Sequence, residues 1–449
     1  ITIDMKKLFI SLIVASVALM GVSAQEGSAV VLLNYNTVKK KVEKSNTDIE
    51  DPKKGAKAAT WMKRGEVYQD VFMVGLEQLQ EGMPATTMTL FYNEPNSIDT
   101  ETKDGASYEY YKYDHMTYTY VNGALQEWER VDPIHEDPLK VAMEAYFKAI
   151  ELDEKGKVQS KAKENLTELK AQLKRQGVNA YYKSDYDNAL GSFENVLTVN
   201  NQEVFAGEFD TVMVQYSGII SREIAGKTDN KELYNKAIKY YKQLAEVNYG
   251  GPNTYLQIKM DYLSLGDTLS GLEIMKEAYE KYPDTINVIA NIADTYIATK
   301  QFDEGIEFMA MVIENNPDLP EAYYWNGRLL INKEDVEFID KALESYEKSA
   351  ELDPSIYYVW YDMGYIYYLQ GADFYERSND EEHEPTREKL IELGHEKYQE
   401  AIASLEKSYE LNDQNMEVKY ETLDLLQRMY YKEQMMDDYE RVKELKNQI

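Results

Sequence analysis

The sequence predicts an all-α solenoid, in which pairs of antiparallel helices stack one after another along the chain. Apolar and small residues recur in register at one fixed period. The first copy is Tyr255, Tyr262, Gly271, Met275, Ala278 and Pro283, and the second, 34 residues later, is Ile289, Tyr296, Gly305, Met309, Val312 and Pro317. This period is the length of one unit of two helices, and a single unit would leave its apolar face exposed. Stacking several units buries those faces, which predicts an array.

The same pattern continues on both sides of these two units. Small residues let two helices cross closely, while large residues fill the neighbouring gaps. Matching positions in the other units include Trp61, Gly65, Tyr68, Ala142, Tyr146, Gly177, Ala189, Phe193, Gly218, Ala237, Gly327, Ala342, Tyr346, Gly364, Ala401 and Leu405. One later unit has extra residues between its two helices, which predicts a loop or helical insertion near residues 371–396.

Two segments carry the clearest match to a known family. Trp360-x2-Met363-Gly364-x2-Tyr367 matches a first helix, and residues 341–354 match a second helix with its closing proline. With these segments the chain resembles tetratricopeptide-repeat (TPR) proteins. The resemblance implies a right-handed TPR superhelix over residues 134–449, with residues 25–81 forming N-terminal helices and the first half of repeat 1.

Residues 82–133 depart from the helical pattern. Three segments rich in β-branched and aromatic residues predict strands, and an Asn-Gly pair predicts a hairpin turn. The segments are Thr86–Tyr92, Ser107–Tyr113 and Thr117–Val121, and the turn is Asn122-Gly123. They fall between the two helices of the first unit, so we expect a small β-hairpin insertion carried by the solenoid. In this respect the chain is similar to a group of exported bacterial TPR proteins that largely lack an assigned activity.

The first residues predict export. Lys6 and Lys7 precede an unbroken apolar stretch, and small residues at Val22 and Ala24 stand where a signal peptidase requires them. We therefore expect residues 1–24 to be a signal peptide with a short upstream extension, and the product to be periplasmic or secreted in a Gram-negative bacterial envelope. The stretch is shorter than the roughly 20 residues of a membrane span. The chain has no cysteine for lipid attachment, so we expect no membrane-spanning segment after cleavage.

Charge and motifs argue against nucleic-acid binding and catalysis. The formal net charge of −31 repels phosphate backbones. Residues 221–228 end like a phosphate-binding loop but lack its first glycine, and each of the three His-Glu pairs lacks the second histidine of a zinc-protease helix. With four histidines and no cysteine, the commonest catalytic groups are scarce. We expect no catalytic residue, metal site or cofactor, and a cryptic envelope enzyme remains only as a second alternative.

Tyrosines mark the candidate binding surface. The chain contains 39 of them, and the TPR resemblance implies which positions of a first helix face the concave groove. In the unit that begins at Tyr357 these positions hold Tyr358, Tyr361, Tyr365 and Tyr368, and the preceding unit adds Tyr324 and Arg328. Tyrosine and arginine are enriched at the anchors of protein interfaces. We therefore predict an exported scaffold that binds a protein or peptide partner through a tyrosine-rich groove.

Two other interpretations stay open for the same tyrosines. Tyrosine rings also stack on sugars, so a glycan or cell-wall ligand in the same groove is the alternative function. The tyrosines could instead pack against residues 371–396, which would then cover the groove. Capture of chaperone tails is not expected, because that family clamp needs lysine and asparagine where one unit of this chain has Asn287, Ala290 and Asp294.

Overall fold

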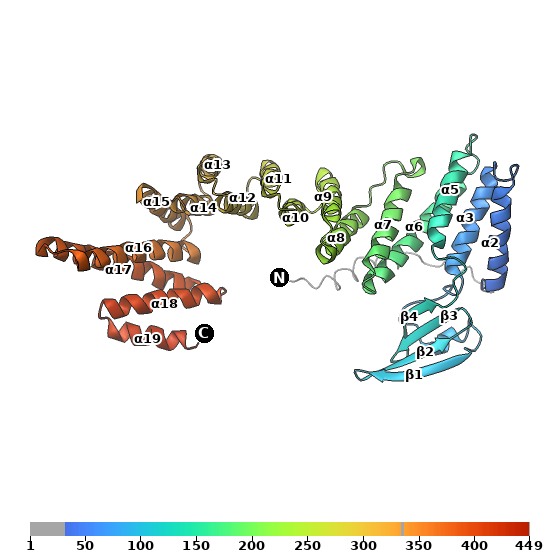
Figure 1. Ribbon diagram of the computed structural model, residues 1–449, viewed down its shortest axis with the longest axis horizontal. Coiled ribbons are helices and arrows are strands. Elements are labelled where there is room, and N and C mark those ends of the chain that lie inside the picture. The colour runs from blue at the N-terminus through green and yellow to red at the C-terminus, as the bar shows by residue number, and fades with distance from the viewer. Residues whose placement is uncertain (1–31, 334–335, 449) are drawn as a thin grey trace. The chain divides into compact units, whose positions relative to one another are not determined.

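The computed structural model describes residues 32–333 and 336–448, so the predicted signal peptide at residues 1–24 lies outside the described residues. The chain divides into two compact units, which we call the N-terminal unit (up to residue 240) and the C-terminal unit (from residue 241). Each unit is a stack of antiparallel helix pairs, as Figure 1 shows. None of the helices in these described ranges is both long enough and apolar enough to cross a membrane.

The N-terminal unit consists of helices that pair in sequence order, with a small sheet inserted into one pair. The two helices on either side of the insertion, α3 and α5, pack against each other, and α6 packs against α7. The division between the two units falls within α9. The helices are α2 (Tyr35–Glu50), α3 (Ala58–Met73), α4 (Ala85–Met88), α5 (Pro138–Glu151), α6 (Gln159–Tyr182), α7 (Tyr186–Asn200), η1 (Glu203–Phe205), α8 (Thr211–Thr228) and α9 (Lys231–Glu246).

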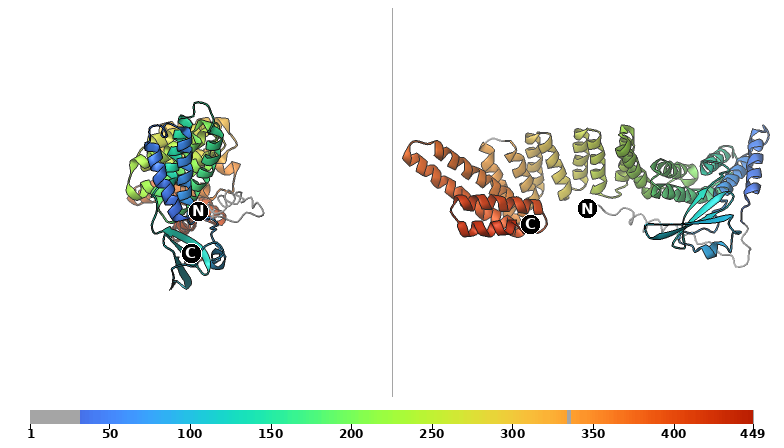
Figure 2. Two further views of the ribbon diagram at one scale, coloured as in Figure 1. Left: turned by 90° about the vertical axis from the view of Figure 1, so that its right-hand side faces the viewer. Right: turned by 60° about the horizontal axis from the view of Figure 1, so that its bottom comes forward.

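The C-terminal unit continues with further helix pairs, each packed against the next (Figure 2, right). The insertion near residues 371–396 is helical, because it forms the end of α16 and the beginning of α17. These two helices are accordingly long, with 24 and 28 residues. The helices are α10 (Pro252–Ser264), α11 (Thr268–Lys281), α12 (Ile286–Ala298), α13 (Phe302–Asn315), α14 (Pro320–Ile331), α15 (Val336–Leu352), α16 (Tyr357–Asp380), α17 (Glu384–Leu411), α18 (Met416–Lys432) and α19 (Met436–Lys446).

Capping side chains fix where several helices begin. Asp185, Asp210 and Asp267 each accept a hydrogen bond from the backbone N–H three residues later, at 3.3, 3.1 and 3.0 Å. Asn415 caps α18 in the same way, at 3.1 Å. Each cap satisfies a backbone donor that the helix itself leaves free, which stabilises the helix by about 1 kcal/mol.

Glycines lie where the two helices of a pair cross, as the repeat pattern predicts. A β-carbon on Gly177 of α6 would come 2.5 Å from the ring of Phe193 on α7. A β-carbon on Gly327 of α14 would come 2.6 Å from the ring of Tyr346 on α15. Both rings are fully buried, so these glycines are needed for close packing. The predicted all-α solenoid is confirmed.

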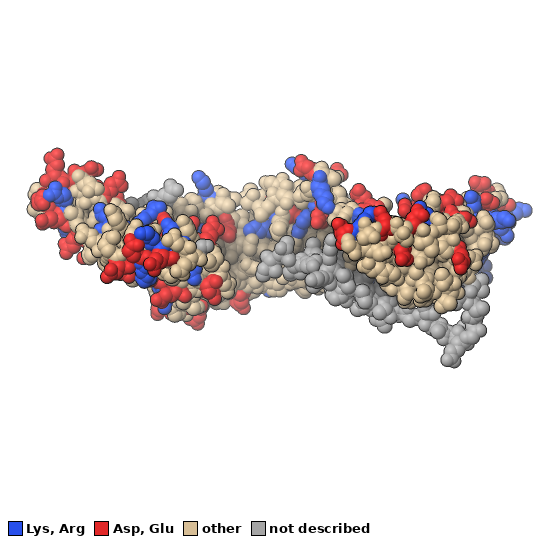
Figure 3. Space-filling model, turned by 90° about the horizontal axis from the view of Figure 1, so that it is seen from below, with Lys and Arg blue, Asp and Glu red and all other residues tan. Residues whose placement is uncertain are grey.

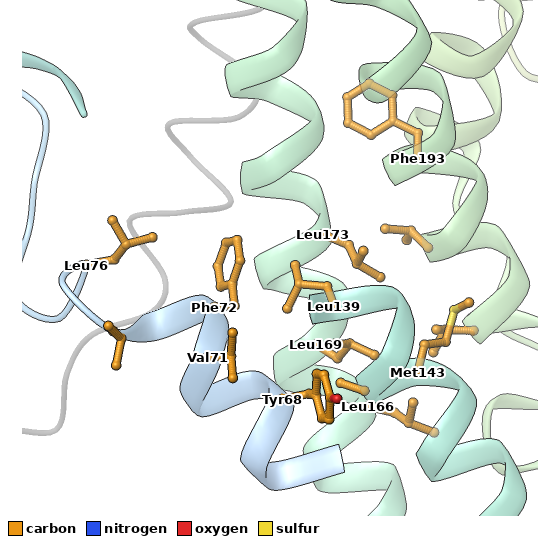
Figure 4. Packing of buried hydrophobic residues seen from close by; sticks show 14 of the residues in the cluster. Tyr68, Val71, Phe72, Leu76, Leu139, Met143, Leu166, Leu169, Leu173 and Phe193 are labelled. Atoms are coloured by element: carbon orange, nitrogen blue, oxygen red, sulfur yellow. The ribbon is translucent and has the colours of Figure 1, made fainter. Parts of the chain in front are cut away.

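The core of the N-terminal unit joins helices on both sides of the insertion. Figure 4 shows side chains from α3, α5 and α6, among them Phe72, Leu139 and Leu169, gathered between the three helices. Leu139 and Leu169 are fully buried and Phe72 is 7% exposed. Burying large apolar side chains is the main favourable contribution to such a core. The insertion therefore does not separate the first helix pair.

The inserted strands form one antiparallel sheet in the order β1-β2-β3-β4. Tyr118 and Tyr120 of β3 and Leu125 of β4 are buried, and the Tyr118 hydroxyl donates a hydrogen bond to the Gly75 carbonyl at 2.7 Å. The predicted small β insertion is therefore confirmed. The strands are β1 (Ser97–Lys103), β2 (Ala106–Lys112), β3 (Met116–Val121) and β4 (Ala124–Arg130).

The strand predicted at Thr86–Tyr92 is wrong. This segment begins with the short helix α4 and continues as turns. Pro84, with φ of −65°, stands at the N-cap of α4, and proline favours a helix start. The chain then turns so that Met88 becomes buried, 1% exposed, and Tyr92 donates a hydrogen bond to the Glu77 carbonyl at 2.5 Å. Burial of Met88 and the hydrogen bond of Tyr92 outweigh the β-propensity of the segment.

Charged side chains of both signs are interspersed on the face shown in Figure 3, including the part that belongs to the C-terminal unit. Several pair within one helix, such as Lys348 with Glu351 at 2.8 Å and Lys341 with Glu337 at 2.9 Å. Exposed pairs of this kind each contribute less than about 1 kcal/mol. They do not explain the fold, which depends on the buried helix contacts.

Candidate partner-binding site

Three of the four tyrosines predicted on α16 form a row along that helix. The ring centroids of Tyr361 and Tyr365 lie 6.4 Å apart with their planes at 8°, and those of Tyr365 and Tyr368 lie 6.5 Å apart at 27°. Residues three and four apart share one helix face, which explains the row. Tyr398 of α17 continues it, because its ring stacks on Tyr368 at 5.7 Å and 9°. We call Tyr361, Tyr365, Tyr368 and Tyr398 the tyrosine row.

Side chains from α18 hold two members of the row. The Tyr361 hydroxyl donates a hydrogen bond to Glu421 Oε2 at 2.9 Å. Burial and this hydrogen bond raise the pKa of Tyr361. A hydrogen bond with Tyr368 raises the pKa of Arg428, another α18 residue. Tyr365 is the most exposed ring of the row, with 42% of its surface accessible.

The helical insertion near residues 371–396 supports one end of the row. The ring of Tyr375 meets Tyr398 edge-on, with centroids 5.1 Å apart. The Tyr375 hydroxyl donates a hydrogen bond to Glu433 Oε1 at 2.6 Å. Nδ1 of His395 contacts the other oxygen of this carboxylate, and the Glu433 side chain is only 4% exposed. The insertion thus anchors on the end of α18 and leaves the middle of the row exposed.

The other predicted site residues form a second group, between α14 and α16. The rings of Tyr324 and Tyr358 lie 4.5 Å apart. Nη1 of Arg328 donates a hydrogen bond to the Tyr324 hydroxyl at 3.0 Å and lies 3.8 Å from Asp362 Oδ2. Tyr324 is 7% exposed, whereas the Arg328 side chain is 36% exposed. Tyr324 is therefore a buried support for the partly exposed Arg328.

This second group contains polar atoms that burial leaves poorly paired. Burial raises the pKa of Asp362 to about 6, against the opposing effects of Arg328 and of a hydrogen bond from Tyr324. Tyr346 on α15 is fully buried, and its hydroxyl finds no hydrogen-bond partner within residues 32–333 and 336–448. Sequence reasoning misses Asp362, because its position is not one of those that face the groove in the family pattern.

The arrangement offers a ligand aromatic edges together with hydrogen-bonding groups. The ring of Tyr365 lies between those of Tyr361 and Tyr368, and its plane makes angles of 8° and 27° with theirs. A guanidinium has five N–H donors, and Arg328 also lies 5.8 Å from the ring of Trp325. Rings that provide apolar area, beside an arginine that provides donors, suit a chain with apolar side chains and carbonyl groups.

Comparison with known proteins identifies the repeat. The model of the family described as "Tetratricopeptide repeat" matches residues 262–329, which cover α11, α12, α13 and most of α14. No curated protein matches the sequence.

Several solved structures are similar in fold at low sequence identity. A TPR repeats protein from Bacteroides fragilis is 16% identical, covering 57% of this chain and 97% of its own, with a TM-score of 0.32. The C-terminal part of a TPR repeat-containing protein from Cytophaga hutchinsonii is also 16% identical, with 62% and 99% covered and a TM-score of 0.37. YrrB, a TPR protein with an unusual peptide-binding site, is 16% identical, with 44% and 94% covered and a TM-score of 0.28.

Proposed function

We propose that the chain, which matches the tetratricopeptide-repeat model over residues 262–329, is an interaction scaffold that binds a protein or peptide partner through the tyrosine row. TPR proteins are in general scaffolds and not enzymes, since each repeat contributes surface instead of a reactive centre. The fold alone supports the general role of protein interaction. The specific surface and partner class rest on the site described above.

One observation carries the proposal. Tyr365 keeps 42% of its surface exposed although it lies between two tyrosines that are packed against neighbouring side chains. A ring fixed on both sides loses little conformational freedom when a partner covers it, so more of the contact energy remains for binding. Such a preorganised aromatic is the usual centre of a protein interface.

The exposed guanidinium of Arg328 favours a peptide over a sugar. An apolar peptide side chain can contact ring edges, and the exposed donors of Arg328 suit peptide carbonyls or a carboxylate. A glycan or cell-wall ligand remains the second candidate, and it is supported only by the number of tyrosines.

We also propose that the chain works after export to the periplasm or beyond. The support is the sequence order of two lysines, an apolar stretch and small residues at Val22 and Ala24. Mass spectrometry of the protein from the envelope fraction would find a mature chain that begins at Gln25. An intact start at Met5 in that fraction would contradict cleavage.

A peptide selection tests the proposed function. A random peptide library is selected against the chain, and the enriched peptides are measured against Tyr365→Ala and against Tyr431→Ala. Tyr431 lies on α18 outside the row and is 66% exposed, so it is a matched control. We expect Tyr365→Ala to weaken binding by about 2 kcal/mol, close to thirtyfold, and the control to bind normally. Equal binding by both variants would exclude the row, and a glycan array run in parallel tests the second candidate.

A further inference from the structure

A second candidate binding site lies on the second helices of two successive pairs, away from the tyrosine row on α16. An open cleft of about 530 Å³ runs between α11 and α13. Its volume is within the range of small-ligand sites, about 300 to 1,000 Å³. It lies in the repeats that match the family, whose usual binding surface is formed by the first helices. We call it the outer cleft.

Two aromatic rings form the apolar wall of the outer cleft. The rings of Tyr279 on α11 and Phe308 on α13 have centroids 5.1 Å apart and planes at 70°, so they meet nearly at a right angle. Met311, one turn further along α13, also lines the cleft and is 41% exposed. Two rings at right angles offer a cation a face and an edge of aromatic surface, and the negative face is the attractive one.

The rim of the cleft is acidic. Glu280 and Asp284 line it, and the amide of Asn316 can donate a hydrogen bond to Asp284 Oδ1 at 3.2 Å, which holds that carboxylate in place. The single lysine of the lining, Lys276, is already engaged, because its ammonium lies 2.8 Å from Glu273. It also lies 5.5 Å from the ring centroid of Tyr296. The net charge around the opening is therefore negative.

The wall of the cleft also holds an unpaired polar atom. Tyr279 is 6% exposed, and among the residues that the structure describes its hydroxyl has no hydrogen-bond partner. A buried hydroxyl without a partner is unfavourable, so this part of the wall is poorly satisfied by the protein alone. Aromatic rings and carboxylates are the two features of this cleft that bind an ammonium or guanidinium group.

We propose that the outer cleft binds the cationic side chain of a lysine or arginine on a basic partner protein. The net charge of −31 would attract such a partner, and the cleft would give the contact a defined position. The cation lies against the ring of Phe308, which packs on Tyr279, and pairs with Glu280 and Asp284. This site is separate from the tyrosine row, so both surfaces can be occupied at once.

Methyl NMR tests the proposal on the whole chain. The probe is the capped tripeptide Gly-Lys-Gly, and its control replaces lysine by norleucine, which keeps the apolar stem without the charge. The protein carries ¹³C-methyl methionine, and the signal of Met311 is assigned with Met311→Leu. We expect a saturable shift of the Met311 signal with the lysine peptide only, and no shift at Met260, which is 54% exposed on α10.

Two double variants separate a specific site from general attraction by an acidic protein. Glu280→Gln with Asp284→Asn should weaken binding at least about fivefold. The control, Asp413→Asn with Glu417→Gln, removes the same charge from exposed positions near the start of α18. It should change the affinity for the lysine peptide less than about twofold. Phe308→Leu, which removes only aromatic character, should weaken binding about threefold.

Three results would overturn the proposal. One is equal weakening by both double variants, which indicates general electrostatic attraction. Another is an equal response to the norleucine peptide, which indicates an apolar groove. The third is the absence of a saturable shift at Met311 when the other methionine signals show a folded protein.

Discussion

Replacing Asp362 with asparagine tests whether burial or the nearby Arg328 dominates the pKa of Asp362, where α14 meets α16. Burial raises the pKa of Asp362 from 3.8 to about 6 even though Arg328 opposes the shift. Each pKa unit corresponds to about 1.4 kcal/mol, so the charged form costs about 3 kcal/mol of stability. The side chain is 21% exposed, which makes this an upper value.

The sign of the pH dependence follows from the direction of the shift. Between about pH 4 and pH 6 the folded protein holds this proton more tightly than the unfolded chain does, so the stability contribution falls as pH rises. Below this window both states are protonated and the penalty is absent. Asparagine keeps the shape and cannot ionise. Relative to the wild type, Asp362→Asn should therefore gain up to about 3 kcal/mol between pH 4 and pH 7.

Tryptophan fluorescence gives a suitable assay of the C-terminal unit. Of the four tryptophans, Trp325 and Trp360 lie in this unit, so a Trp61→Phe/Trp128→Phe background removes the signal of the N-terminal unit. The free energy of unfolding in urea is measured from pH 4 to pH 7 for this background with and without Asp362→Asn. Subtracting one value from the other cancels the contributions of the other carboxylates, which both proteins share. Asp413→Asn, at an exposed position, is the control and should give a flat difference. If the stability gained by Asp362→Asn stays constant or falls as pH rises, Arg328 and not burial dominates the pKa of Asp362.

Two further predictions concern packing and polar pairing. In thermal unfolding, Gly177→Ala should destabilise the N-terminal unit by about 1 to 3 kcal/mol, because its β-carbon would come 2.5 Å from Phe193. The control is Gly191→Ala on the neighbouring helix, whose β-carbon would meet nothing within 4 Å. It should be neutral or stabilising by up to about 1 kcal/mol. Tyr346→Phe should leave stability unchanged or raise it, because the substitution removes an unpaired buried hydroxyl. Tyr324→Phe should lower stability by about 1 to 2 kcal/mol, because the hydrogen bond from Arg328 is lost. Equal effects within the glycine pair in thermal unfolding, or within the tyrosine pair in urea unfolding, would contradict these assignments.

The repeat pattern predicted the helix pairs because the residues that define it are set by close packing. Gly177 and Gly327 belong to the repeat pattern, and each meets a buried ring of the paired helix. The sheet was predicted only in part. β2 and β3 are aromatic and partly buried, but β1 is exposed along its whole length, so its sequence carries no apolar alternation that would reveal it.

The candidate site was predicted where it depends on one helix and missed where it depends on several. The spacing of Tyr361, Tyr365 and Tyr368 places them together on α16, and the structure has them in one row. The contacts from Tyr398 and Glu421 come from helices far along the sequence. Helical periodicity describes one face of one element, so it cannot indicate which residues of other helices cover that face.

Site-specific photo-crosslinking at position 365 tests the central claim most directly. A photoreactive phenylalanine replaces Tyr365 in one variant and Tyr431 in another, and both are irradiated in the cells that produce the protein. Both positions are exposed, so labelling by chance contact should be similar. We expect a discrete protein adduct from position 365 that is absent from position 431. The same adducts from both positions, or none from position 365, would contradict partner binding at the tyrosine row.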